Sequence, residues 1–131
     1  MATSADPSDR CLTGTPWSVR LGRASEGRTA LEVYDAESLI DVVVATRVAP
    51  EILRGARRGH RSAFAWGRLP LEAGALTVLF GRGRRHRDVH AAGVIAVGGF
   101  CWLAVAHGTF NNVTVSHRGA RRGRLRMRKV R

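Results

Sequence analysis

Apolar and polar side chains alternate with a period of two along much of this chain. Because successive side chains of a strand point to opposite faces, and because β-branched residues fit a pleated surface, each alternating run predicts a half-buried β-strand. The clearest runs are residues 17–21, 29–34, 40–48, 62–66, 76–80 and 112–116. Near the C-terminus, Gly119 to Gly123 is predicted to turn the chain. Leu125 and Met127 then share one face, opposite Arg124, Arg126 and Arg128, which predicts a basic final strand.

The longest stretch without a charge, residues 91–106, predicts a β-hairpin. Gly98 and Gly99 lie between two apolar arms, and a Gly-Gly pair is typical of tight hairpin turns. The opposing pairs would be Val97 with Phe100, Ile95 with Trp102, and Val94 with Leu103. Both faces would then be apolar, so we expect cover on both sides and core positions at Ile95, Val97, Phe100 and Trp102. The stretch is shorter than the roughly 20 residues of a spanning helix, so we predict no membrane span.

These runs, separated by turn residues, predict an all-β fold, an antiparallel β-sandwich or barrel of about 8–9 strands. One short helix near 50–58 is possible, because Pro50 suits a first helical position and Glu51 a first turn. Gly55 weakens that helix, and an irregular basic loop is the alternative. We expect a flexible leader over residues 1–16 and a single β-domain over residues 17–131, ending in the basic strand.

Positive charge is concentrated in the C-terminal part of the chain. The sequence holds 22 Lys and Arg against 10 Asp and Glu, a net charge of +12. Residues 1–51 hold five basic and eight acidic residues, whereas residues 52–131 hold 17 basic residues and two acidic ones, Glu72 and Asp88. This asymmetry favours an anionic partner: nucleic acid, a membrane surface or an acidic protein.

The reversal of successive strands predicts where these charges meet. In an antiparallel fold each turn lies at the opposite end from the turn before it. With Gly98 and Gly99 at one end, segments 49–61, 81–87 and 107–111 and the C-terminus fall at the other. The candidate polyanion-binding residues at that end are Arg54, Arg57, Arg58, Arg61, Arg82, Arg84, Arg85, Arg87, Arg128, Lys129 and Arg131.

Catalytic and metal-binding patterns are weak by comparison. His86, Asp88 and His90 would share one face of a strand, but the neighbouring arginines disfavour a divalent cation and no fourth ligand is evident. Cys101 lies among core residues, where a thiol is usually inert, and no Gly-x-Ser-x-Gly motif occurs. We predict neither enzymatic activity, nor a cofactor, nor a bound metal.

The N-terminus lacks the apolar segment of a secretory signal, so we expect a cytoplasmic protein with Cys11 and Cys101 reduced. Its predicted function is sequence-independent binding of a polyanion, the nucleic-acid backbone, through the clustered arginines. Stacking on bases should contribute little, because only Tyr34 and Phe110 fall outside the core alternation of the aromatic residues. The alternative is an adaptor or assembly module that docks an acidic protein or self-associates through a strand edge.

Overall fold

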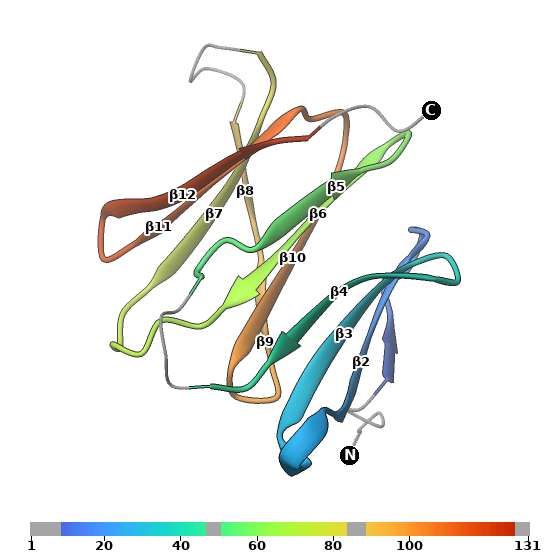
Figure 1. Ribbon diagram of the computed structural model, residues 1–131. Coiled ribbons are helices and arrows are strands. Elements are labelled where there is room, and N and C mark those ends of the chain that lie inside the picture. The colour runs from blue at the N-terminus through green and yellow to red at the C-terminus, as the bar shows by residue number, and fades with distance from the viewer. Residues whose placement is uncertain (1–8, 47–50, 84–88, 128–131) are drawn as a thin grey trace, which may run out of the picture.

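Three antiparallel sheets are stacked in the computed structural model, which describes residues 9–46, 51–83 and 89–127 (Figure 1). The strand orders are β1-β2-β3-β4 in the first sheet, β5-β6-β10-β9 in the middle sheet and β12-β11-β7-β8 in the third. The predicted all-β, sandwich-like class is therefore confirmed, with more strands than the alternation alone indicated.

The first sheet is a meander built from the N-terminal third of the chain. Its elements are β1 (Asp9–Cys11), β2 (Trp17–Arg23), a 3-10 turn η1 (Ser25–Gly27), β3 (Thr29–Asp35) and β4 (Ser38–Val44). Leu12, directly after β1, is buried. Strand β1 and Leu12 thus lie inside the segment predicted to be a leader.

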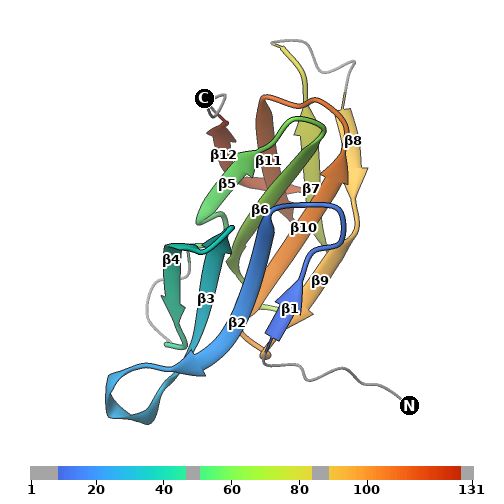
Figure 2. The same ribbon diagram turned by 90° about the vertical axis from the view of Figure 1, so that its right-hand side faces the viewer.

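The middle and third sheets exchange strands. The middle sheet contains β5 (Gly55–Arg58), β6 (Ser62–Arg68), β9 (Val94–Val97) and β10 (Cys101–His107). The third contains β7 (Leu76–Gly81), β8 (Val89–Ala92), β11 (Asn112–His117) and β12 (Ala120–Arg126). β8 and β9 follow each other with only Gly93 between them, so one edge of the two sheets is continuous, while β5 and β12 approach each other at the opposite edge (Figure 2).

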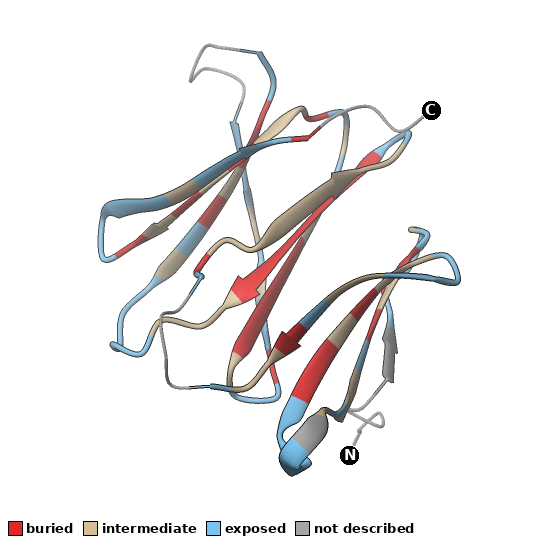
Figure 3. Cartoon of the chain, in the orientation of Figure 1, coloured by how far each residue is buried: buried red, intermediate tan, exposed pale blue. Residues whose placement is uncertain are grey.

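Two apolar layers separate the three sheets, and the central strands of the middle sheet, β6 and β10, are buried on both faces (Figure 3). Along β10, Cys101 and Leu103 pack against the first sheet, whereas Trp102 and Ala104 pack against the third. The predicted cover on both sides of the hairpin is therefore confirmed for this arm.

The hairpin register differs from the predicted one by one residue. Gly98 and Gly99 do form the turn, with φ values of +65° and +78°, and Phe100 N donates to Val97 O. Phe100 nevertheless has no opposite residue in the pairing of β9 with β10, and Val97 lies opposite Cys101 rather than Phe100. A three-residue loop shifts every later pair, so Leu103 faces Ile95 and Trp102 faces Ala96.

The shifted register and the edge position of β9 also correct the predicted core. Val97 and Trp102 are buried, but Phe100 is only half-buried and Ile95 is 41% exposed. Among the described strands, β9 has a neighbour on one side only, so its outward side chains reach solvent.

The described residues of the predicted helix near 50–58, which are residues 51–58, form no helix, and the second half of the segment is strand β5. Residues 51–54 already run antiparallel to β6: Arg68 N donates to Glu51 O, and Arg54 N donates to Trp66 O. Gly55 explains the choice, since a Cβ there would lie 2.3 Å from the Trp66 ring. The glycine that weakens a helix allows this strand to cross a tryptophan.

The last hairpin turns earlier than the sequence suggested. The turn is Arg118–Gly119, with φ values of +54° and +81°, and β12 starts at Ala120. The segment 119–123, predicted to be a turn, is mostly strand and carries a β-bulge opposite Val115 and Ser116. The basic C-terminal strand is therefore longer than predicted.

An ion pair attaches the first sheet to the middle sheet. Asp41 on β4 accepts hydrogen bonds from Arg54 Nε (2.7 Å), Arg54 Nη2 (2.9 Å) and Trp66 Nε1 (2.8 Å). Burial alone raises the pKa of Asp41, but the bonds and charge of Arg54 and the bond from Trp66 outweigh it and hold this pKa below its ordinary value.

Candidate polyanion interface

Three loops meet at one end of the two C-terminal sheets, as the reversal of successive strands predicts. Ser62, at the start of β6, lies opposite His107, at the end of β10, and Gly81, at the end of β7, lies opposite Asn112. Hydrogen bonds join the loops: Gly108 N donates to Arg61 O (2.8 Å), and Asn111 N donates to Gly81 O (2.9 Å). This end lies at the top of Figure 1.

Three of the predicted arginines surround the β10–β11 loop at this end. Arg58 Nη1 donates to Phe110 O (3.3 Å), and the Arg82 guanidinium lies 5.6 Å from the Phe110 ring centroid. Arg61 is exposed, and its backbone carbonyl is bonded to the same loop. We call Arg58, Arg61 and Arg82 the basic end.

Two other predicted arginines do not join this cluster. Arg54 is bonded to Trp66 in the second half of β6, away from the end where Ser62 begins this strand. It forms ion pairs with Asp41 and with Glu51, whose Oε1 is 2.6 Å from Arg54 Nη1. Arg57 pairs opposite Phe64, on the sheet face that turns away from Arg58. A helix would have grouped these residues, but a strand spreads them along its length and alternates their faces.

The remaining candidates lie outside the described residues: Arg84, Arg85, Arg87, Arg128, Lys129 and Arg131. Their part in the cluster stays a prediction. The same holds for His86 and Asp88 of the rejected metal pattern, and within the described ranges no group of His, Cys, Asp and Glu could hold a metal ion.

Phe110 is not the free aromatic side chain that its loop position suggested. It is 6% exposed and belongs to the core between the middle and third sheets, beside Phe80. Because its ring is buried beneath Arg82, it cannot serve as a platform for a base.

Sequence reasoning missed a second basic surface, on the outer face of the third sheet. Arg124 lies opposite Thr114, Arg126 opposite Asn112, and Arg121 opposite Ser116. All three arginines are exposed, and β12 is pale blue along most of its length in Figure 3. We call Arg121, Arg124 and Arg126 the basic face. In the sequence, the alternation of Arg124 and Arg126 with Leu125 and Met127 indicates this face. Arg121 was not assigned to it, because residues 119–123 were predicted to be a turn rather than part of β12.

A hollow of about 250 Å³ runs across this sheet face. All four strands contribute to it, with Arg121 and Arg124 from β12, and it extends to Gly83 at the basic end. Its lining residues are Leu79, Gly81, Gly83, Val89, Asn112, Thr114, Ser116, Gly119, Arg121 and Arg124.

The basic end and the basic face adjoin each other. Phe110 O accepts from Arg58, and the next residue, Asn111, accepts from the backbone N of Met127, which follows Arg126. Asn111 Oδ1 also accepts from Gly83 N (3.1 Å), beside Arg82. The two sets of cations therefore border one loop.

Carboxylates do not neutralise these cations within the described part of residues 51–127. That part holds eleven arginines and two acidic residues. Glu51 is paired with Arg54 and Glu72 with Arg118 (3.3 Å), and neither arginine belongs to the basic end or the basic face. No ion pair among the described residues involves a cation of either surface, so the positive potential there has no paired counterion.

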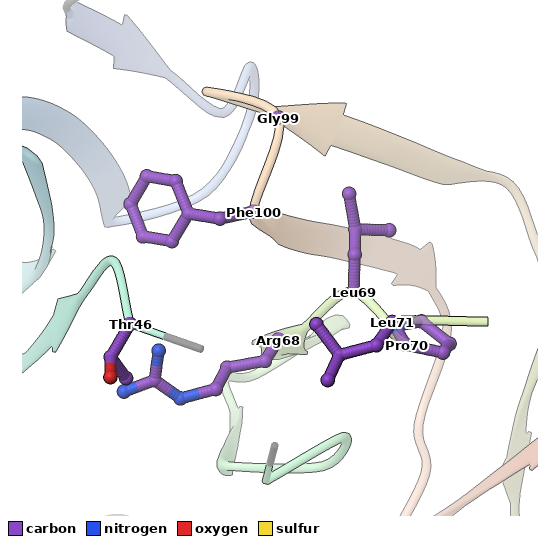
Figure 4. Close-up of a pocket in the computed structure, with 7 residues that line it drawn as sticks. All are labelled: Thr46, Arg68, Leu69, Pro70, Leu71, Gly99 and Phe100. Carbon is purple, nitrogen blue, oxygen red and sulfur yellow. The ribbon is translucent and has the colours of Figure 1, made fainter. Parts of the chain in front are cut away.

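A different hollow, of about 220 Å³, lies at the other end, beside the Gly98–Gly99 turn (Figure 4). Phe100, Leu69 and Leu71 lie around Arg68 in its lining. Arg68 Nη1 donates to the backbone O of Val44, the last residue of β4. We read this arginine as a link between the first and middle sheets.

The two cysteines have unlike surroundings, and neither is in a disulfide. Burial raises the pKa of Cys101 to about 12, although the charges of Arg68 and Arg54 act in the opposite direction. A thiol with so high a pKa is a poor nucleophile at neutral pH.

No protein-family model matches the chain, and no curated protein or solved structure is significantly similar to it. Among the described residues, no helix has the length and apolar character needed to cross a membrane.

Proposed function

We propose that this protein is a non-catalytic module that binds the phosphate backbone of nucleic acid without sequence preference. One observation carries the proposal: the basic end and the basic face adjoin each other, and both carboxylates in the described part of residues 51–127 are already paired elsewhere. Arginine is well suited to this partner, because its planar fork donates two hydrogen bonds to one phosphate.

The absence of an exposed aromatic platform at Phe110 supports sequence tolerance. Phosphate contacts carry no sequence information, whereas base stacking and base-edge bonds do. Binding should therefore be electrostatic, similar for unrelated sequences, and weakened by salt. A cytoplasmic location is part of the same proposal.

The test is a salt series. Binding to unrelated duplex and single-stranded oligonucleotides is measured by fluorescence anisotropy, and log K is plotted against log[salt]. We expect a slope of several units, since each neutralised phosphate contributes about 0.9 for duplex and about 0.7 for single strands. A flat plot, or no binding at low salt, would refute the proposal.

A matched pair of variants adds specificity to this test. The substitutions Arg61→Gln and Arg82→Gln remove two charges from the basic end, and Arg20→Gln with Arg23→Gln removes two exposed charges from β2. We expect the first pair to weaken binding much more than the second. Equal weakening would mean that net charge alone, and not this surface, determines affinity.

A second candidate function is assembly through an edge strand. β9 is an edge of the middle sheet and exposes Ile95, and Leu39 on the edge strand β4 is 52% exposed. Exposed apolar edges support pairing with another chain. Sedimentation across a concentration series tests it: a dimer that Ile95→Lys abolishes would favour assembly, and a monomer throughout would count against it.

A further inference from the structure

The basic face combines a row of cations with a row of small polar side chains. The register sets Arg121, Arg124 and Arg126 of β12 beside Ser116, Thr114 and Asn112 of β11. Each guanidinium therefore has a hydroxyl or an amide as its neighbour on the next strand.

The polar row has free hydrogen-bonding capacity. The hydroxyls of Thr114 and Ser116 make no hydrogen bond with other described residues. Asn112 Nδ2 donates to Gly83 O (3.1 Å) and to Asn111 Oδ1 (2.8 Å), which leaves Asn112 Oδ1 as an acceptor. Donors and acceptors are thus available in the middle of the sheet face.

The remaining two strands give the hollow an apolar side. Leu79 on β7 is half-buried, and Val89 on β8 is 46% exposed. Gly81 leaves room for the Asn112 side chain, since a Cβ there would lie 2.7 Å from Asn112 Oδ1. Across the hollow, from β12 to β8, the lining changes from cationic to polar to apolar.

This order matches the cross-section of one nucleic-acid strand, which has phosphate on one side, sugar in the middle and base on the other. The polar row from Asn112 to Ser116 is about 14 Å long, and Arg124 and Arg126 are about 7 Å apart along β12. An extended strand presents successive phosphates in such a line. A duplex is a wide cylinder with bases inside, so it would contact only the rim of the hollow.

We propose that the basic face is the path of single-stranded nucleic acid. Its phosphates lie along Arg121, Arg124 and Arg126, its sugars contact the polar row of β11, and its base faces rest on Leu79 and Val89. This inference depends on the proposed function and adds to it the strand class and the route. Since the described part of the face has no aromatic side chain, the energy comes mainly from phosphate contacts.

The test compares two triple variants that remove the same number of charges. Arg121→Gln, Arg124→Gln and Arg126→Gln alter the basic face, and Arg20→Gln, Arg23→Gln and Arg28→Gln alter exposed positions of the first sheet. Each is titrated with an oligothymidylate of about 12 nucleotides and with a duplex of equal phosphate number. Melting curves confirm that both variants are folded.

We expect the basic-face variant to bind the single strand at least about tenfold more weakly than the control variant, and to lower its salt slope by about 2. Duplex binding should fall less than single-strand binding, because a duplex reaches only the arginines at the rim of the hollow; an equal loss for both nucleic acids would refute the single-strand path. If all nucleic acids bind with steep salt dependence but the two triple variants behave alike, the route is wrong and the proposed function survives. If nothing binds, both fail.

Chemical footprinting of arginines on the wild-type protein tests the same path without relying on variants, which could misfold. Phenylglyoxal modifies accessible arginines, and mass spectrometry reports which ones the oligothymidylate protects. Protection of Arg121, Arg124 and Arg126, with Arg20 and Arg23 still modified, would support the path. Protection confined to other arginines would overturn it, as would equal protection by poly-glutamate, which would indicate an acidic protein partner.

Discussion

At the scale of single residues, the Asp41 carboxylate fixes the positions of the Arg54 and Trp66 side chains. Because Arg54 is bound to Asp41, it does not join the predicted basic cluster, and the Trp66 indole is oriented by its bond to the same carboxylate. Its side chain is 18% exposed and that of Arg54 is 24% exposed, so the pair is shielded from most screening by salt.

The lowered pKa of Asp41 predicts acid sensitivity. In the folded state this pKa lies below its ordinary value of 3.8, so the carboxylate contributes stability that is fully present above pH 3.8. That contribution is lost as the pH falls through the folded pKa, because the unfolded chain then binds the proton more tightly. Asp41→Asn should lower the free energy of unfolding at pH 7 by about 1–3 kcal/mol and flatten its decline below about pH 4.

Urea unfolding at a series of pH values measures this effect. Glu37→Gln, at an exposed turn position between β3 and β4, is the control and should leave the decline unchanged. A wild-type decline that Asp41→Asn does not alter would show that the ion pair is not responsible.

The thiols give a second prediction at this scale. Cys11 is exposed, whereas burial raises the pKa of Cys101 to about 12. Ellman's reagent should therefore titrate one thiol per native chain and two after unfolding, and Cys11→Ser should abolish the native reaction. Rapid reaction of both thiols in the native protein would contradict the burial of Cys101.

At the scale of elements, close approaches at glycine decide which strands can lie together. Residues 51–54 pass so near β6 that a Cβ on Gly67 would lie 1.9 Å from Ile52 O. Ile52 O also accepts from Trp102 Nε1 (2.6 Å), so the same point ties β10 to this segment.

Gly67→Ala should therefore be costly. The added methyl must displace the Ile52 carbonyl and break the bond from Trp102, and we expect a loss of at least about 2 kcal/mol in the free energy of unfolding. Gly93→Ala, between β8 and β9, is the control, because nothing lies within 4 Å of its Cβ position. Chemical denaturation of both variants should separate them, and similar losses would mean that Gly67 tolerates a side chain.

At the scale of the whole molecule, the separation of charge between sheets governs stability as well as binding. Most carboxylates belong to the first sheet, whereas the described part of residues 51–127 holds eleven arginines and two acidic residues. Repulsion among these cations opposes folding unless counterions or a partner offset it.

Polyanions should therefore stabilise the fold. At low ionic strength we expect inorganic polyphosphate to raise the melting temperature by several degrees, since a ligand at 100 times its Kd adds about 2.7 kcal/mol to the stability of the bound state. Moderate NaCl should reproduce part of the increase by screening alone. Poly-lysine is the control, and an equal increase with poly-lysine would rule out the charge mechanism.

Much of the fold could be predicted from local pattern. The alternation of side chains located most strands, and the Gly98–Gly99 pair located a turn, because period and positive φ are properties of short segments. The charge separation along the chain was equally visible. Strand reversal, which follows from short connections, brought Arg58, Arg61 and Arg82 to one loop.

The tertiary structure alone decided which charges are free and which face they share. Arg54 looked like the other cations in the sequence, but a carboxylate 13 residues earlier binds it once the first two sheets pack. Phe110 looked exposed, but the meeting of the middle and third sheets buries it. Arg121 joined Arg124 and Arg126 only because a bulge in β12 turns it to the outer face. Local pattern sets the period of a strand, whereas burial, ion pairing and register depend on contacts between segments that lie far apart in the sequence.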